Sequence, residues 1–179
     1  MERWKHFKTI TKHRHLVCRY CFRVGLYWQG LTHDLSKYSP TEFNVGAKYY
    51  QGYRSPNVGE RNDIGYSTAW LHHKGRNKHH FEYWIDYLPG SREVTPVHMP
   101  PKYLVEMCMD RIAACRVYHG DDYTDADPWE YLHRGLDNRF MHPDTKRELD
   151  ELLTVLKDQG EEALFAYIKK NVLGKENNG

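Results

Sequence analysis

Apolar residues recur at helical spacing along much of the chain. In the first segment they lie at Leu16, Val17, Tyr20, Val24 and Tyr27. An α-helix completes a turn every 3.6 residues, so these side chains share one face. The pattern predicts a helix from about His13 that ends near Gly30, because a glycine often follows the last helical turn.

Similar spacing predicts helices in the rest of the chain, and these are expected at residues 33–50, 69–73, 77–87, 101–118, 128–137, 143–158 and 160–172. Glycine, proline and asparagine are frequent at 51–62 and 88–101, which are expected to be loops. No strand pair is evident, and residues 174–179 are expected to be frayed.

These elements predict an all-α fold in which residues 1–179 form a single-domain helical bundle. A chain of 179 residues suits one domain with a buried core. A hydrophobic content of 40% is that of a folded chain rather than a disordered one. Cys18 and Cys21 have C-x-x-C spacing within a helical pattern, without a second close pair, and are expected to be reduced core cysteines.

Charge is unevenly distributed, although the net charge is only +2. Residues 1–30 hold seven Lys and Arg and one acid, whereas residues 120–162 hold 13 acids and five Lys and Arg. The basic first part could attract nucleic acid or phosphate, or could be a solvated helix face. No apolar run of 18 residues predicts a membrane span, and the first residues lack the apolar centre of a signal peptide. A cytoplasmic protein without a membrane partner is therefore expected.

Histidine is frequent, with 12 residues, and four of them fall within "HHKGRNKHH" at 72–80. His13 lies on the apolar face of the first predicted helix, and Asp110 lies among the apolar positions of the helix at 101–118. A carboxylate on a buried face is costly unless it is paired or bound to a metal ion. Asp110 therefore indicates either a buried salt bridge or a metal site of the kind found between the helices of bundles.

The stretch "HDLSK" at 33–37 places a histidine and an aspartate side by side. Their side chains would point about 100° apart on a regular helix. Lys37 follows Asp34 by three residues and so projects the same way, where it could pair with Asp34 or hold a phosphate oxygen. Nitrogen and oxygen donors without thiolates suit iron, manganese, zinc, cobalt or nickel.

Three motifs together resemble the HD-domain superfamily of metal-dependent phosphohydrolases. They are H-x-x-x-V at 13–17, HDLSK at 33–37 and EMCMDRIAA at 106–114. The histidine-rich stretch further resembles a small branch of HD-like proteins from bacteria and phages. The resemblance covers about residues 10–118, and the helices at 128–172 lie outside it. The "GYP" signature of cyclic-dinucleotide phosphodiesterases is absent, so that activity is not implied.

The resemblance implies a ligand set and a mechanism. The metal ligands it implies are His13, His33, Asp34 and Asp110, with His73 and His80 for a second ion. His15 is the rival of His13, and His79 and His72 are the rivals in the second set. Lys37 would stabilise charge on the phosphoryl oxygens, and Arg76 is a second candidate for this role. Asp34 could bridge two ions, and His79 or His72 could protonate the leaving group.

The expected function is hydrolysis of a small phosphorylated substrate, a nucleotide or another phosphate ester, with one or two divalent transition metals. One alternative is a di-iron oxygenase of the HD type, and another is a non-catalytic module in which metal staples the helices and the basic first part binds nucleic acid or a partner. Dimers are common in the superfamily, which leaves a homodimer open, but the sequence does not determine the oligomeric state.

Overall fold

The structure is a computed structural model that describes residues 1–90, 92–134 and 140–174. Within these ranges it contains eight α-helices, several shorter helical turns and one two-stranded sheet. The all-α fold class expected from the sequence is confirmed. Residues 135–137 of the helix expected at 128–137, and residues 175–179 of the tail expected to be frayed, lie outside the described ranges.

The first predicted helix is divided in two. α1 spans Glu2–Arg23, Gly25 reverses the chain in the left-handed region (φ 86°), and α2 spans Tyr27–Thr32. The expected end at Gly30 is therefore wrong. Gly30 lies inside α2, where an added Cβ would lie 3.1 Å from the carbonyl oxygen of Cys18. This glycine serves the close approach of α2 to α1 rather than helix termination.

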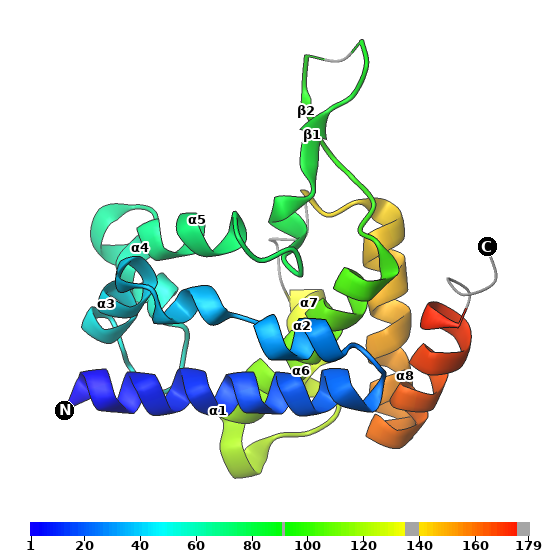
Figure 1. The fold of residues 1–179 in the computed structure, drawn as a ribbon, viewed down its shortest axis with the longest axis horizontal. Coiled ribbons are helices and arrows are strands. Elements are labelled where there is room, and N and C mark those ends of the chain that lie inside the picture. The colour runs from blue at the N-terminus through cyan, green and yellow to red at the C-terminus, as the bar shows by residue number, and fades with distance from the viewer. Residues whose placement is uncertain (91, 135–139, 175–179) are drawn as a thin grey trace.

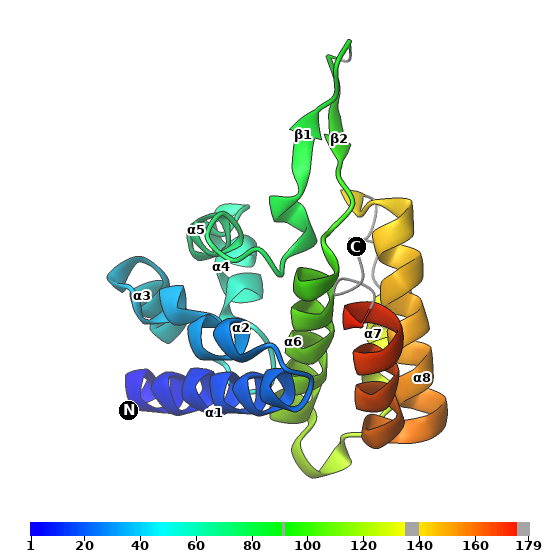
Figure 2. The same cartoon turned by 45° about the vertical axis from the view of Figure 1, so that its right-hand side comes forward.

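The central helix is α6, at Pro101–His119, which lies between α1 and the C-terminal helix α8, at Pro143–Tyr167 (Figure 2). Its first residue is a proline, which has no amide hydrogen to leave unpaired in the first turn. Apolar side chains of α1, α6 and α8 form most of the core. The helix predicted at 101–118 is thus the element on which the rest of the fold packs.

The C-terminal third packs on the far side of α6 from α3, α4 and α5 (Figure 2). α7 spans Asp127–Arg134, and α8 runs through a kink at Gly160 (φ 82°) into a π-helical turn, η5, at Ile168–Leu173. Gly160 has non-helical backbone angles (φ 82°, ψ 176°), so the chain keeps a break between the two helices expected at 143–158 and 160–172, which lie side by side (Figure 2). The basic and acidic parts of the chain meet here, because Arg23 lies 2.5 Å from Glu162.

Short helices replace the long one expected at 33–50. A 3-10 turn, η1, covers Leu35–Tyr38, and α3 covers Pro40–Lys48. The hydroxyl of Ser39 accepts a hydrogen bond from the Glu42 amide at 3.4 Å, which caps α3 at its start. α3 packs against both α1 and α5, and its residues Glu42 and Gly46 line a cavity between these helices.

The loop expected at 51–62 is also wrong, because α4 occupies Pro56–Ile64 and is followed by α5 at Thr68–Lys74. A proline begins α4, and Gly65 ends it in the left-handed region (φ 86°). The buried carboxylate of Glu60 accepts hydrogen bonds from the hydroxyls of Ser67 and Thr68. These hydrogen bonds hold α5 against α4. The hydrophobic pattern of the sequence does not predict them.

The helix expected at 77–87 and the absence of a strand pair are both corrected. Phe81–Tyr83 form a single 3-10 turn, η2, and β1 at Ile85–Tyr87 pairs antiparallel with β2 at Val94–Pro96. The hairpin projects from the body of the molecule (Figure 1). Tyrosine, isoleucine, valine and threonine favour strands, and Gly90 takes the positive φ angle (78°) that its turn requires.

Two smaller points complete the fold. Among the helices of the described residues, none is long and apolar enough to cross a membrane.

All four cysteines carry free thiols, and Cys21 and Cys108 are buried in the core. Burial in apolar surroundings raises the pKa of the Cys108 thiol to about 12, so this side chain behaves as a small hydrophobic group.

Candidate metal centre

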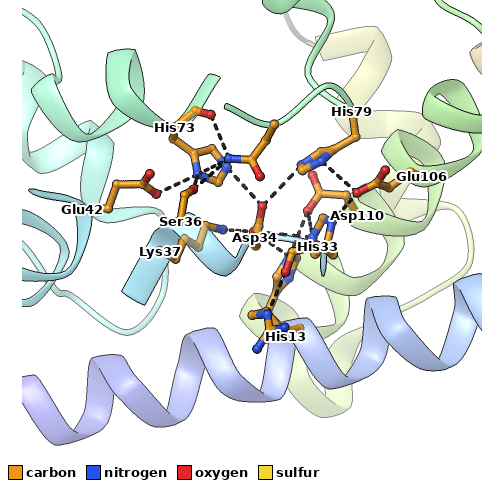
Figure 3. A network of polar contacts seen from close by, with 12 residues as sticks. His13, His33, Asp34, Ser36, Lys37, Glu42, His73, His79, Glu106 and Asp110 are labelled. Carbon is orange, nitrogen blue, oxygen red and sulfur yellow. Dashed lines mark hydrogen bonds and ion pairs between the residues drawn. The ribbon is translucent and has the colours of Figure 1, made fainter. Parts of the chain in front are cut away.

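His33 and Asp34 connect α2 to η1 through a backbone that no regular helix allows. His33 leaves α2 with non-helical angles (φ −49°, ψ 127°), and Asp34 lies in the left-handed region (φ 54°). Asp34 is the sole non-glycine residue with positive φ in the described ranges. Aspartate tolerates this region better than most residues. The reversal turns both side chains into the same space, which a helix through them would not do (Figure 3).

The first group of candidate ligands, called the first group below, comprises His13 of α1, His33, Asp34 and Asp110 of α6. His13 Nε2 lies 2.9 Å from Asp110 Oδ1 and 3.7 Å from Asp34 Oδ2. His33 Nε2 lies 3.4 Å from each of the same two oxygens. Two imidazole nitrogens and two carboxylates from three separate segments therefore converge on one point, as metal ligands do.

The second group comprises His73 at the end of α5, His79 and His80 from the following turn, and Asp34 again. His73 Nε2 lies 3.2 Å, and His79 Nε2 3.5 Å, from Asp34 Oδ1. The imidazole rings of His79 and His80 are 4.1 Å apart between centroids. Asp34 thus presents Oδ2 to the first group and Oδ1 to the second, so that one carboxylate lies between both.

Four donor atoms of the two groups lack a hydrogen-bond partner among the described residues, although the Lys37 ammonium lies 2.6 Å from Asp34 Oδ2. Asp34 is fully buried, and neither of its oxygens, nor Nε2 of His79 or His80, has a hydrogen bond with acceptable geometry among the described residues. Leaving such atoms unsatisfied in the interior costs on the order of 1–3 kcal/mol each. A cation bound by each group would satisfy them. The buried histidines and carboxylates could therefore hold a metal ion.

Two glutamates contact the Nδ1 atoms of the histidines, on the side of each ring away from Nε2. Oε1 of Glu106 lies 2.9 Å from His33 Nδ1 and 3.1 Å from His79 Nδ1, so one oxygen accepts from a histidine of each group. Glu42 accepts from His73 Nδ1 at 2.7 Å. A proton held on Nδ1 leaves the Nε2 lone pair for a metal ion, and this carboxylate–histidine–metal arrangement is typical of protein sites.

Sequence reasoning missed both glutamates, although a signal for Glu106 was present. Glu106 precedes Asp110 by four residues, so both carboxylates lie on the same side of α6. Glu106 also falls inside the motif EMCMDRIAA. Glu42 carried no comparable signal, because its position depends on how α3 packs against α5.

Burial and charge act against each other in this centre. Burial lowers the pKa of His13, which favours the neutral imidazole that can coordinate a metal ion. Although burial raises the pKa of Asp34, the charges of His33 and Lys37 hold it well below its usual range. Burial opposes protonation of His33, yet the neighbouring Asp34 carboxylate raises its pKa to about 10. In the metal-free protein, protons and the Lys37 ammonium balance the carboxylates.

Lys37 pairs with Asp34 and also faces a cavity. Its Nζ lies 2.6 Å from Asp34 Oδ2, and the Asp34 charge raises the Lys37 pKa despite burial, so the ammonium stays charged. A cavity of about 500 Å³ opens over the centre and is lined by Lys37, His13, His73, His80 and Asp110. Both roles considered for Lys37, partner of Asp34 and neighbour of a ligand, fit this position.

The structure separates the rival histidines. His15 is exposed on the outer face of α1, whereas His13 points into the centre. His72 bonds Glu42 at 2.6 Å and belongs to neither group. His79 is nearly inaccessible, with 1% of its surface exposed, and is absent from the cavity lining. Arg76 is exposed and bonds the carbonyl of His72, so it does not face the cavity.

The chain was compared with known proteins. Residues 2–155 match a family described as "Family of unknown function (DUF5662)". No curated protein and no solved structure matches the chain. The geometry of the metal centre therefore carries the functional argument.

Proposed function

This chain belongs to the DUF5662 family, whose function is unknown, and we propose that it is a metal-dependent phosphohydrolase of the HD type. It would cleave a phosphate ester or anhydride, with a nucleotide as the expected substrate. The reaction would require one or two divalent transition-metal ions. Manganese, iron, zinc, cobalt and nickel are the candidates, because the donors are imidazole nitrogens and carboxylate oxygens.

The observation that carries this proposal is the division of Asp34 between two groups. Its two oxygens face separate sets of histidines, at 3.4 Å from His33 and 3.2 Å from His73. Paired metal sites that share ligands in this way suit phosphoryl transfer, because one ion can activate the nucleophile while the other stabilises the leaving oxygen. The cavity beside His80 and Asp110 gives a substrate access.

The roles of the protein's own groups follow from their positions. A bound transition metal supplies a water molecule of lowered pKa and draws charge from phosphoryl oxygens. His13, His33, Asp34 and Asp110 would hold one ion, and Asp34, His73, His79 and His80 the other. The charged Lys37 would hold a phosphate oxygen and stabilise the charge that develops on it.

The role of His79 is revised in this proposal. Proton delivery to a leaving group requires contact with the ligand, and His79 does not line the cavity. We assign His79 to the second metal group, where its Nε2 faces Asp34. His80 lines the cavity, but burial together with the neighbouring His79 and His73 holds its pKa well below the usual range, which favours coordination over proton donation.

Phosphate release tests the proposal. The protein would be loaded with each of the five metals in turn and offered a panel of nucleoside phosphates and a simple aryl phosphate. We expect turnover with at least one combination. Lys37→Ala should keep the metal and lose roughly 100-fold or more in turnover, the cost of removing one charge-stabilising group.

Lys48→Ala is the matched control, because Lys48 is an exposed lysine at the end of α3. It should behave as the unaltered protein. Absence of phosphate release from every metal-loaded preparation, or release that survives in Asp34→Asn, would overturn the proposal. If Lys37→Ala instead releases the metal and unfolds the chain, Lys37 serves only as the partner of Asp34.

A di-iron oxygenase is the second candidate, and one observation favours it. A carboxylate that lies between two histidine-rich groups, with no cysteine in either, also suits a pair of iron ions. Iron content combined with oxygen consumption would support that activity. Zinc or manganese content combined with phosphate release would support the phosphohydrolase.

A further inference from the structure

The cavity over the metal centre is larger than a phosphate group needs. Its volume of about 500 Å³ falls within the range of pockets that enclose small organic ligands. The metal-centre residues form only part of its lining. Other parts come from α4 and the segment before it, from α6 beyond Asp110, and from Tyr131 of α7. A ligand that fills the cavity extends well past the metals.

Arg111 is the most unusual group in this lining. It follows Asp110 on α6, and its Nε is buried without a hydrogen-bond partner in the described part of the chain. Its guanidinium lies 5.7 Å from the centre of the Tyr131 ring. An arginine stays charged, so a buried donor without an acceptor is costly.

The other charges of the lining support an anionic ligand. Arg61 and Arg54 also line the cavity, and the Arg61 guanidinium lies 5.7 Å from the centre of the Trp70 ring. Two of the lining carboxylates are already engaged at the metal centre, Asp110 by His13 and Glu42 by its histidines. Glu82 is a third carboxylate in the lining. Arg54 donates to Gln51 Oε1 at 2.5 Å and Arg61 is exposed, so Arg111 is the arginine of the lining whose Nε is buried without an acceptor among the described residues.

We propose that Arg111, assisted by Arg61, forms a second anion subsite in the cavity lining, made of residues outside the two metal groups, that binds a phosphate or carboxylate group of the substrate. This inference rests on the proposed function for the position of the first phosphate. It narrows the substrate class to phosphate esters that carry a second anionic group. Planar guanidinium groups bind such oxyanions through paired, charge-assisted hydrogen bonds.

Non-hydrolysable probes test the subsite without reference to turnover. Alkane-1,ω-bisphosphonates of increasing chain length would be compared with alkylphosphonates of the same length, by calorimetry on the metal-loaded protein. At one length, the bisphosphonate should bind about tenfold more tightly or better, as expected for one charge-assisted contact. Arg111→Gln should abolish this preference and leave the affinity for the monophosphonate nearly unchanged.

Arg147→Gln is the control, because Arg147 is an exposed arginine on α8 that pairs with Asp144. It should keep the full preference. Equal affinity for the two probes at every length, or a preference that persists in Arg111→Gln, would overturn the subsite. The two proposals fail separately: a protein that prefers bisphosphonates but releases no phosphate keeps the subsite and loses the hydrolase, and one that hydrolyses phosphates without the preference does the reverse.

Discussion

The two groups of the metal centre share Asp34 but rest on different kinds of structure. In the first group, His13 and Asp110 belong to α1, of 22 residues, and α6, of 19 residues. In the second group, His73 lies in the last turn of the seven-residue α5, and His79 and His80 follow in a turn. Long packed helices fix two of the four ligands of the first group, whereas the three histidines of the second group lie on a short segment.

This difference should appear in metal affinity. Ligands that are already in place pay little conformational entropy when an ion binds, whereas ligands on a turn must be ordered. The Glu106 carboxylate partly compensates, because it tethers His79 to the same helix that carries Asp110. We therefore expect two ions with unequal affinity. A variant of the shared ligand should affect both ions, and a variant of an unshared ligand should affect one.

The largest effect is expected from Asp34, the residue common to both groups. Asp34→Asn keeps the size of the side chain and tolerates the positive φ angle, but it removes the charge that faces both groups. Both ions should be lost, as measured by elemental analysis of the purified protein against the unaltered chain. Retention of one ion would show that the groups do not share this ligand.

Asp34→Ala adds a backbone effect to the loss of charge. Alanine at a left-handed position costs roughly 1–2 kcal/mol. The melting temperature of Asp34→Ala should therefore lie below that of Asp34→Asn, while the metal content of both is equally low. Equal melting temperatures would mean that the turn relaxes at no cost when the aspartate is removed.

Variants of unshared ligands should divide the centre. Asp110→Asn should remove the ion of the first group and spare that of the second, and His80→Gln should do the opposite. Titration with cobalt, whose visible spectrum reports coordination, would follow each site separately. If either variant loses both ions, the two ions bind cooperatively. The shared Asp34 carboxylate would then determine metal affinity more than the difference between long helices and a short segment does.

The next effect in size concerns the two glutamates. Glu106→Gln should weaken both ions by about 10–100-fold, the usual cost of losing a carboxylate behind a ligating histidine. Glu42→Gln should weaken only the second ion, because Glu42 contacts His73 and no histidine of the first group. Equal weakening of both ions by Glu42→Gln would contradict the division drawn from the distances.

The same division explains what the sequence could predict. α6 and the Asp110 position were predicted because a long helix carries a long repeating pattern, which tolerates a boundary error of a few residues. His13 was preferred to His15 because the motif spacing and the apolar stripe agreed. His13 and Asp110 therefore rest on features that a local pattern contains, whereas a turn replaces the helix predicted over His33 and Asp34.

The second group depends on contacts between distant segments. Residues 77–87 look helical in pattern, yet Asn77 donates to Ser36 of η1 at 2.9 Å and the chain turns into a hairpin. The sequence predicts a loop at 51–62 because this stretch is rich in glycine, proline and asparagine, yet Pro56 begins a helix there. Short elements of this kind are decided by packing, which local pattern does not contain.

The last effect concerns stability rather than metal binding, and it depends on the contact between α1 and α3 near the first group. His6 lies on α1, seven residues before His13, and packs against Gly46 of α3. A Cβ added at Gly46 would lie 2.4 Å from the Nε2 atom of His6, so any larger residue there would displace the His6 ring. Burial and the charge of Lys37 lower the His6 pKa to about 4, from an ordinary 6.5. The unfolded chain therefore binds a proton more readily than the folded one. Stability from this site is complete above pH 6.5 and falls as the pH drops towards 4.

At pH 5 the loss should be on the order of 2 kcal/mol relative to pH 7.5. His6→Phe has no proton to bind and keeps a ring against Phe43 and Tyr50. Denaturant unfolding at both pH values should show a smaller loss on acidification for His6→Phe than for the unaltered chain, both in the metal-free form. Equal losses would mean that α1 stays docked to α3 when His6 is protonated. The carboxylates of the centre would then carry the acid sensitivity, because their lowered pKa values also make stability fall with pH.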